Sequence, residues 1–230
     1  MDTITYHPMH KIPTAVAVQQ LLRSPCLPVH VQRFQSLLQA EHEKRKRFYE
    51  EMSEQQKVEF INGEIVVQSP AKLRHTTAVR NLSTLLDVYV SKSELGYVGQ
   101  EKMLITLTRN DYEPDVCYFG PEKARTFTPD QMRFPAPDFA VEVLSPSTET
   151  NDRGIKFVDY AAHGVAEYWI VDPDAEMIEQ YVLEGEIYQL RVKTDTGTVR
   201  SVAVEGFAVP VRAVFDEAEK LAAVRGILTV

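Results

Sequence analysis

Two Pro-Asp pairs in the chain each open a run of β-forming residues. Asp115 follows Pro114 and precedes Val-Cys-Tyr-Phe, and Asp138 opens the run Asp-Phe-Ala-Val-Glu-Val-Leu. A proline is tolerated at the first residue of a strand, because its missing N–H is harmless there. Strand side chains alternate between the two faces of a sheet, so the second run places Glu142 on the face of Asp138, Ala140 and Leu144.

Glu142 is therefore a carboxylate among apolar neighbours, on a strand that we expect to be central. Burying a lone carboxylate is unfavourable unless it is paired, hydrogen-bonded or bound to a metal ion. Places where a sequence breaks its own pattern in this way tend to be functional. The alternatives are an ion pair with a nearby Arg or Lys for Glu142, and a turn or cap role for Asp115.

Lys156 is predicted to lie close to Glu142. Asn151 or Asp152 can cap a helix that runs to His163. The first turns of this helix follow the C-terminal end of the strand that carries Glu142. The long lysine side chain can then place its ammonium group beside the carboxylate.

Two acids and a lysine at one edge of a sheet suit metal-assisted hydrolysis of a phosphodiester. In this chemistry Asp115 and Glu142 hold a divalent cation, which acidifies water and offsets charge on the phosphate. Lys156 would orient or deprotonate the attacking water. The alternative is that Lys156 only neutralises Glu142 as a salt bridge, and both roles are compatible.

The elements before residue 95 are predicted from periodicity and turn residues. Residues 1 to about 30 are expected to be irregular because of their prolines, and residues 30–52 to form one or two helices. The charged run at the end of this helix is interpreted as a solvated face rather than a phosphate-binding patch. Asn62-Gly63 predicts a β-hairpin. Residues 74–90 predict a helix with a buried stripe of Val79, Leu82, Leu85, Leu86 and Tyr89.

The second part of the chain mixes strands with helices. Strands are expected over residues 97–107, 115–119, 138–144 and 167–172, followed by a hairpin across Glu184-Gly185 and a last helix from about Asp216. The helix over residues 151–163 is expected to face the core with Ile155, Val158, Ala161 and Ala162. Trp169 is expected in the core. This order predicts an α/β (α+β) fold, a sheet covered by helices.

The order of these motifs resembles the Uma2 family of endonucleases, formerly DUF820. The resemblance covers roughly residues 50–190 and depends most on Glu-Val-Leu-Ser-Pro-Ser-Thr followed by the segment from Lys156 to Val-Asp-Pro. It implies a restriction endonuclease-like mixed central sheet flanked by helices, with additional β-hairpins. The implied domain is 49–230, preceded by a partly helical N-terminal extension over 1–48.

By the same resemblance, Asp115 and Glu142 match the acids of the PD-(D/E)XK motif. Leu144 stands where that motif has its lysine, and Lys156 matches the lysine that this family carries on the following helix. Glu59 and His75 match the family more weakly as site residues. The alternatives are solvent exposure for Glu59, and a surface or capping role for His75.

Ser145, Thr148 and Asp152 are expected to shape the loop and cap the helix rather than react. Among the residues of the predicted loop after residue 119, Lys123, Arg125 and Arg133 are the best local candidates for phosphate contact.

The composition limits the classes of function. The net charge of −8 argues against strong nonspecific DNA binding, although clustered metal-binding acids lower net charge. Cys26 and Cys117 are too few for a disulfide framework. The first residues do not resemble a secretory signal and no long apolar run predicts a membrane span, so a cytoplasmic protein is expected. Phosphate-binding loop, dinucleotide, zinc-protease and serine-nucleophile motifs are absent.

These observations predict a nuclease that depends on Mg²⁺ or Mn²⁺ and cuts DNA at Asp115, Glu142 and Lys156. The first alternative is a nuclease-fold binding or interaction protein with little catalysis. The second is a hydrolase of another phosphate ester, which an acidic surface tolerates better. A homodimer is expected by analogy with restriction enzymes, with the N-terminal helix as its contact.

Overall fold

The computed structural model describes residues 14–52 and 56–229, in two compact units, Met1–Glu51 and Met52–Val230. The first unit contains α1 (Thr14–Leu22) and α2 (Leu27–Glu51). The expected helix over 30–52 is confirmed as α2. The expectation of irregular chain is wrong for residues 14–30, because α1 forms there and Pro28 lies in the first turn of α2, where a missing N–H removes no helical hydrogen bond; residues 1–13 lie outside the described residues.

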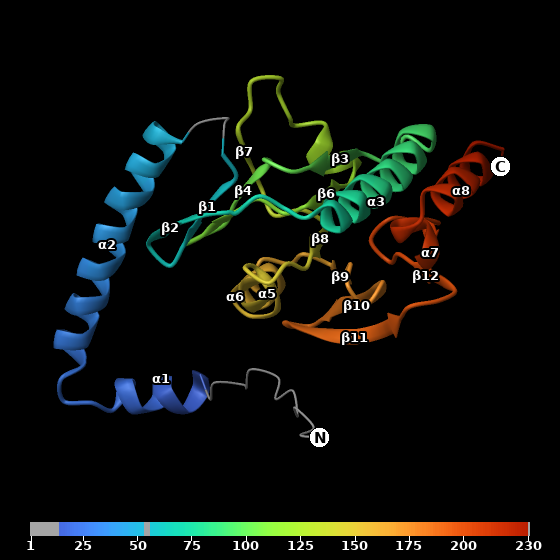
Figure 1. Cartoon of the computed structure of the whole chain (residues 1–230). Helices are drawn as coiled ribbons and strands as arrows, with labels where there is room; N and C mark the ends of the chain where they lie inside the picture. Colours follow the sequence, from blue (N-terminus) through green and yellow to red (C-terminus); the bar gives the residue numbers. More distant parts are fainter. Residues whose placement is uncertain (1–13, 53–55, 230) are drawn as a thin grey trace. The chain divides into compact units, whose positions relative to one another are not determined.

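A six-stranded mixed sheet forms the centre of the second unit (Figure 1). Its strands are β3 (Tyr97–Gln100), β6 (Val116–Phe119), β8 (Phe139–Val143), β9 (Glu167–Asp172), β10 (Met177–Glu184) and β11 (Ile187–Thr194). The order is β11-β10-β9-β8-β6-β3, and only the pair β8–β9 is parallel. The strand that carries Glu142 therefore lies inside the sheet, as predicted.

A second, five-stranded sheet has the order β2-β1-β5-β4-β7. Its strands are β1 (Val58–Ile61), β2 (Glu64–Val67), β4 (Leu104–Thr106), β5 (Asp111–Tyr112) and β7 (Arg133–Phe134). The predicted hairpin is confirmed: β1 and β2 pair in antiparallel fashion across Asn62 and Gly63, whose φ angles are 50° and 83°. Positive φ at both positions is what an Asn-Gly turn provides.

The single strand expected over residues 97–107 is wrong. The segment forms β3 in the six-stranded sheet and β4 in the five-stranded sheet. Glu101 and Lys102 separate the two strands with φ angles of 34° and 55°, so the chain leaves the extended conformation there. The long loop after β6 contains a short helix, α4 (Pro121–Ala124), as well as β7.

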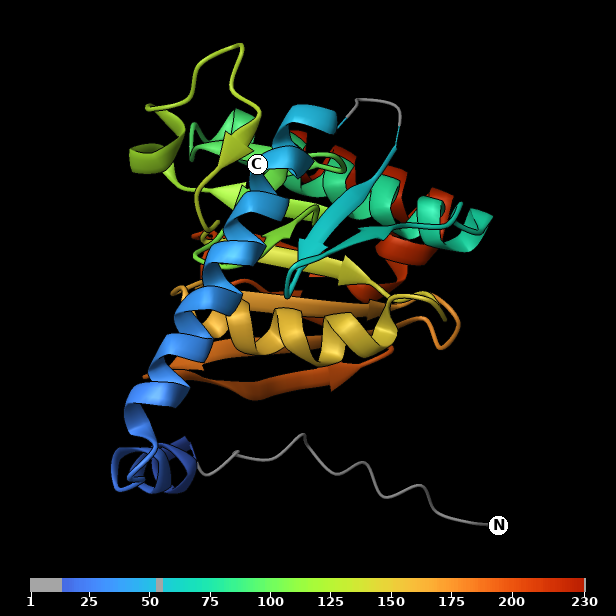
Figure 2. The same cartoon turned by 90° about the vertical axis from the view of Figure 1, so that its left-hand side faces the viewer.

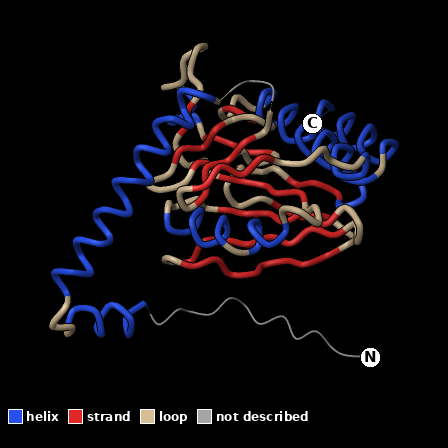
Figure 3. The backbone as a smooth tube through the Cα atoms, turned by 60° about the vertical axis from the view of Figure 1, so that its left-hand side comes forward, coloured by secondary structure: helices blue, strands red, loops and turns tan. Residues whose placement is uncertain are grey.

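Helices cover both faces of the six-stranded sheet, as Figures 2 and 3 show. On one face lie α3 (Leu73–Lys92), α7 (Val211–Phe215) and α8 (Glu217–Thr229). They form a core with alternate strand residues, including Val116, Phe139, Val141, Val143 and Trp169. The opposite face meets α5 (Glu149–Arg153) and α6 (Ile155–Ala162), and its core includes Cys117, Ala140, Tyr160, Tyr168 and Ile170.

The helix expected over 151–163 is broken into α5 and α6 at Gly154. The predicted buried face is partly wrong, since Val158 is 60% exposed and Ala162 is exposed. Lys156 and Tyr160 are buried in their place. The helix turns these polar side chains inward because buried acids of the neighbouring strands are there to pair with them. The N-cap of α5 is Thr148, not Asn151 or Asp152.

The remaining elements agree with prediction. The stripe Val79, Leu82, Leu85 and Leu86 of α3 is buried and Trp169 is in the core, whereas Tyr89 of the predicted stripe is only partly buried. A small sheet of β12 (Thr198–Arg200) and β13 (Ala208–Pro210) precedes α7, and the predicted last helix is α8. The expected mixed α/β (α+β) sheet with flanking helices and extra hairpins is confirmed. No helix within residues 14–52 and 56–229 has the length and apolar character to cross a membrane.

Candidate active site

Asp115 and Glu142 lie on neighbouring strands. β6 and β8 pair in antiparallel fashion with Val116 opposite Val141, so the same register continued by one residue puts Asp115 opposite Glu142. Side chains of directly opposed residues share a face of the sheet. Both carboxylates are almost fully buried, at 3% and 2% exposure, and both line one cleft of about 680 Å³.

Three groups hold the Asp115 carboxylate. The backbone N–H of Val143 donates to Oδ2 at 2.8 Å, and Nε2 of His75 lies 3.4 Å from the same oxygen. The ammonium group of Lys57 donates to Oδ1 at 2.6 Å. Burial would raise the pKa of Asp115, but the Lys57 charge and the contact with His75 outweigh it, so this pKa lies below its usual value.

Lys156 lies at the centre of three buried carboxylates. Its Nζ is 2.9 Å from Oε1 of Glu59, 3.1 Å from Oε1 of Glu142 and 3.1 Å from Oδ1 of Asp152. The lysine side chain is 0% exposed. Tyr160, one turn further along α6, donates its hydroxyl to Oε1 of Glu142 at 3.2 Å.

Burial shifts the proton affinities of this cluster. Burial raises the pKa of Glu142 well above its usual value, and the charges of Asp152, Asp115 and Glu59 add to the effect of burial although Lys156 opposes it. Burial would lower the pKa of Lys156, but its carboxylate neighbours outweigh that and raise it well above the usual value. Lys156 is therefore a charged donor over the ordinary pH range.

The cluster has more acids than bases. Four buried carboxyl groups face two ammonium groups, so the four acids, when all are ionised, exceed the ammonium groups by two negative charges; burial together with this excess raises the pKa of Glu142. The carboxylates are Glu59, Asp115, Glu142 and Asp152, and the ammonium groups are those of Lys57 and Lys156. A divalent cation at the cleft end of the cluster would supply the missing charge.

The donor atoms also fit a hard divalent cation. Asp115 and Glu142 supply carboxylate oxygens from adjacent strands, and these are the ligands that Mg²⁺ and Mn²⁺ prefer. Both acids reach the cleft, so water can complete the coordination of an ion bound there. Among the described residues, no three His, Cys, Asp or Glu side chains form a ready metal-binding group. The oxygen donors of Asp115 and Glu142, and their access to the cleft, fit an open site with two protein ligands.

The structure brings the five predicted site residues together. Lys156 contacts Glu142, and Asp115 lies opposite Glu142 on the neighbouring strand and lines the same cleft, while Glu59 contacts Lys156 and His75 contacts Asp115. Glu59 is 1% exposed, so the alternative of a solvent-exposed side chain is wrong. Glu59 also accepts the backbone N–H of Glu113 at 3.0 Å, which fixes its carboxylate.

Lys57 and Asp152 were missed as site residues. Asp152 is 1% exposed beside Lys156, and is not the helix cap that the sequence suggested. The spacing of Asp152, Lys156 and Tyr160 at every fourth residue could have revealed one helical face. Lys57 precedes Glu59 by two residues, the spacing that puts strand side chains on one face. Ser145 and Thr148 shape the loop as expected, because the Oγ atom of Ser145 and the Oγ1 atom of Thr148 are hydrogen-bonded at 3.0 Å.

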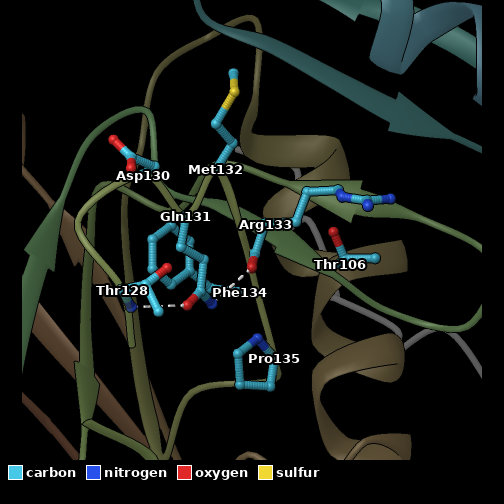
Figure 4. Close-up of a pocket in the computed structure, with 8 residues that line it drawn as sticks. All are labelled: Thr106, Thr128, Asp130, Gln131, Met132, Arg133, Phe134 and Pro135. Carbon is cyan, nitrogen blue, oxygen red and sulfur yellow. Dashed lines mark hydrogen bonds between the residues drawn. The ribbon is translucent and has the colours of Figure 1, made fainter. Parts of the chain in front are cut away.

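The loop after β6 does not line this cleft. Lys123 pairs with Asp138 at 2.7 Å, and Arg125 pairs with Glu122. Arg133 lies at a second hollow of about 600 Å³, which Figure 4 shows with Thr106, Thr128 and residues 130–135 around it. This hollow contains none of the predicted acids. The basic side chains that do line the cleft are Lys57, Lys72, Arg74 and Lys102.

The fold is similar to that of a solved structure from Anabaena variabilis ATCC 29413, described as "a putative nuclease belonging to DUF820". The TM-score is 0.64 at 16% sequence identity, with 75% of this chain and 96% of that chain covered. The fold is thus a restriction endonuclease-like, nuclease-type arrangement of sheet and helices, as the resemblance implied.

Sequence comparison then identifies the family. The Uma2 profile, described as "Putative restriction endonuclease", matches residues 44–212. "Uncharacterized protein sll1609" of Synechocystis sp. is 30% identical over 133 residues, covering 57% of this chain and 75% of the relative. "Uncharacterized protein slr1290" of the same organism is 31% identical over 139 residues, covering 57% and 68%. The chain belongs to the Uma2 family.

Proposed function

We propose that this protein is an endonuclease that hydrolyses DNA phosphodiester bonds in the cleft of Asp115 and Glu142, with Mg²⁺ or Mn²⁺ as its cofactor. The observation that supports this proposal is the excess of acids in the site, in which four buried carboxyl groups face only two ammonium groups. A purely structural cluster would be expected to balance its buried charges.

Asp115 and Glu142 would hold the cation. When bound, it lowers the pKa of a water molecule and offsets negative charge on the phosphate. In the hydrolysis the oxygen of water forms a bond to phosphorus and one P–O ester bond breaks. The leaving oxygen takes a proton, and the other product is a phosphate monoester.

The other residues of the site would position these groups. The raised pKa of Lys156 favours donation to the water or phosphate over removal of a proton, so the orienting role is preferred to the deprotonating one. Glu59 and Asp152 hold Lys156, and His75 holds Asp115. Lys72, Arg74 and Lys102 line the cleft and would meet the phosphate backbone.

The test is incubation of the purified chain with supercoiled, linear and single-stranded DNA in Mg²⁺ or Mn²⁺. Cleavage should require the metal, stop with EDTA and be lost in Glu142→Gln. The matched control is Asp138→Asn, because Asp138 begins the same run, contacts Lys123 and does not line the cleft. Equal cleavage by Glu142→Gln and wild type would contradict the proposal.

Metal binding without cleavage of any DNA would favour the hydrolysis of another phosphate ester, which the net charge of −8 would suit. Absence of both metal binding and cleavage would favour a binding protein with a nuclease fold.

We further propose that residues 1–48 form an extension to a nuclease domain of residues 49–230, and that the extension joins two copies. Val31, Phe34 and Leu38 of α2 recur at helical spacing and are 43–53% exposed. Two copies would place two cleft sites on the two strands of a duplex. Light scattering should give twice the 26.1 kDa chain mass, and Leu38→Glu should give the mass of one chain.

A further inference from the structure

The two oxygens of the Asp115 carboxylate have different partners. Oδ2 accepts the backbone N–H of Val143 and faces His75, so the protein itself fixes this oxygen. Oδ1 is held by the ammonium group of Lys57 at 2.6 Å. A cation that uses Oδ1 must therefore compete with Lys57.

The position of Lys57 allows its side chain to move while its backbone stays in place. The carbonyl of Lys57 accepts the N–H of Gln68 at 3.1 Å, and the next residue begins β1. The side chain lines the cleft and retains 17% exposure, unlike the fully buried Lys156. Lysine carries its charge on a flexible four-carbon stem, so the ammonium group can swing into the cleft.

Ionic repulsion makes simultaneous binding unfavourable. Mg²⁺ binds a carboxylate oxygen at about 2.0–2.1 Å, and an ammonium group left beside that oxygen would lie within a few ångströms of the ion. Lys57 would have to leave Oδ1 before the cation could bind it.

We propose that Lys57 is a built-in competitor of the cation, which occupies the cation position at Oδ1 of Asp115 and is released into the cleft when a divalent ion binds. The inference rests on the proposed cation site. It makes Lys57 a positioning residue that holds Asp115 when no cation is bound. Release would also add a free ammonium group to the wall of the cleft as the cation arrives.

The first test compares Mn²⁺ affinity by calorimetry in the wild type, Lys57→Met and Lys72→Met. Lys72 lines the same cleft but is exposed, so its removal takes away the same charge without touching Asp115. Lys57→Met should bind Mn²⁺ at least about tenfold more tightly than the wild type. The cation no longer has to break a hydrogen bond between charged groups, whose free energy corresponds to about tenfold in affinity. Lys72→Met should differ from the wild type by less than about fivefold. Equal or weaker binding by Lys57→Met, or an equal gain in both variants, would overturn the inference.

The second test uses the wild type, so it does not depend on the folding of a variant. Limited acetylation followed by mass spectrometry measures the reactivity of each lysine with and without saturating Mn²⁺. The reactivity of Lys57 should rise severalfold with Mn²⁺ while that of Lys72 stays constant. Unchanged or lower reactivity of Lys57 would overturn the inference.

The two tests also separate this inference from the proposed function. If the wild type and Lys57→Met bind Mn²⁺ with one affinity, the competition is refuted and the cation site remains. If neither binds Mn²⁺, the cation site itself is refuted, and the competition with it.

Discussion

Replacing Lys156 by methionine removes the only ammonium group that contacts Glu59 and Asp152 among the ion pairs of the described cluster. Methionine retains much of the side-chain volume, so the change is mainly one of charge. Of the carboxylates left behind, Glu59 and Asp152 are each 1% exposed and do not line the cleft, so they cannot be hydrated without opening the core. They must therefore take up protons or remain as uncompensated charges.

The expected loss of stability follows from the protonation of these acids. Protonating one carboxyl group of pKa 4.5 at pH 7 costs about 3.4 kcal/mol, since each pH unit corresponds to about 1.36 kcal/mol. Glu142 already has a raised pKa and contributes less of this cost. We expect Lys156→Met to lower the free energy of unfolding by about 3–5 kcal/mol, the usual range for breaking a buried ion pair.

The loss of unfolding free energy in Lys156→Met should increase with pH. In the variant the buried carboxyl groups have folded-state pKa values above their unfolded values, so the folded state binds more protons. The destabilisation caused by these carboxyl groups is smallest at or below their pKa in the unfolded chain. The stability of the variant falls as pH rises from there toward their pKa in the folded protein. The difference in unfolding free energy between wild type and Lys156→Met should therefore be smaller at pH 5.5 than at pH 7.5. It should change by about 1.4 kcal/mol per pH unit for each extra proton that the folded variant binds.

Urea denaturation followed by circular dichroism at both pH values measures this loss. The matched control is Lys123→Met, because Lys123 pairs with Asp138 at the surface, where both side chains are about one third exposed. The control should lose less than about 1 kcal/mol. A loss below about 1 kcal/mol for Lys156→Met, without pH dependence, would refute the assignment of a charged buried cluster.

Three further predictions concern stability. Burial would raise the pKa of Glu179, but Arg153 and other partners outweigh it and lower the pKa to about 2. About 1–2 kcal/mol of stability, after allowance for solvent screening, should therefore be present above pH 4.5 and lost as pH falls toward 2. In acid titrations the wild type should be more stable than Glu179→Gln above pH 4.5, and this difference should shrink as pH falls toward 2; a constant difference would contradict the lowered pKa. Gly154→Ala should cost about 1–3 kcal/mol in urea denaturation, because a Cβ would lie 2.6 Å from the carbonyl oxygen of Thr150, and an unchanged midpoint would contradict this. Gly63→Val should lower the thermal midpoint by the equivalent of about 1–2 kcal/mol, since φ is +83°, and no change would refute the need for glycine in this turn.

The central sheet and its acids could be predicted from sequence because strand alternation is a local property. The two faces of β8 follow directly from it, and so does the inward direction of Glu142. Lys156 could be placed near Glu142 because its helix follows the strand of Glu142, and the order of motifs in the family then matched Asp115, Glu142 and Lys156 to one site. The contacts of Glu59 with Lys156 depend on pairing between β1 and β5, which single-sequence periodicity does not give.

Two of the failures have one physical cause, because contacts with residues distant in the sequence outweighed the local preference of the segment. α6 exposes Val158 and buries Lys156 because three carboxylates from other elements surround the ammonium group. Asp152 in a polar stretch has the composition of a cap, and only the fold places it in the core. The turn at Glu101 and Lys102 has no glycine or proline, so nothing in the sequence marked the end of β3.

The central claim is that Asp115 and Glu142 hold a divalent cation in a nuclease site. The most direct measurement is anomalous X-ray diffraction from crystals of the wild type equilibrated with Mn²⁺. The account predicts an anomalous peak at about 2.0–2.4 Å from an oxygen of each carboxylate, with Lys57 withdrawn from Oδ1 of Asp115. The absence of an anomalous peak between these two acids at saturating Mn²⁺, or a peak only elsewhere on the chain, would contradict the central claim.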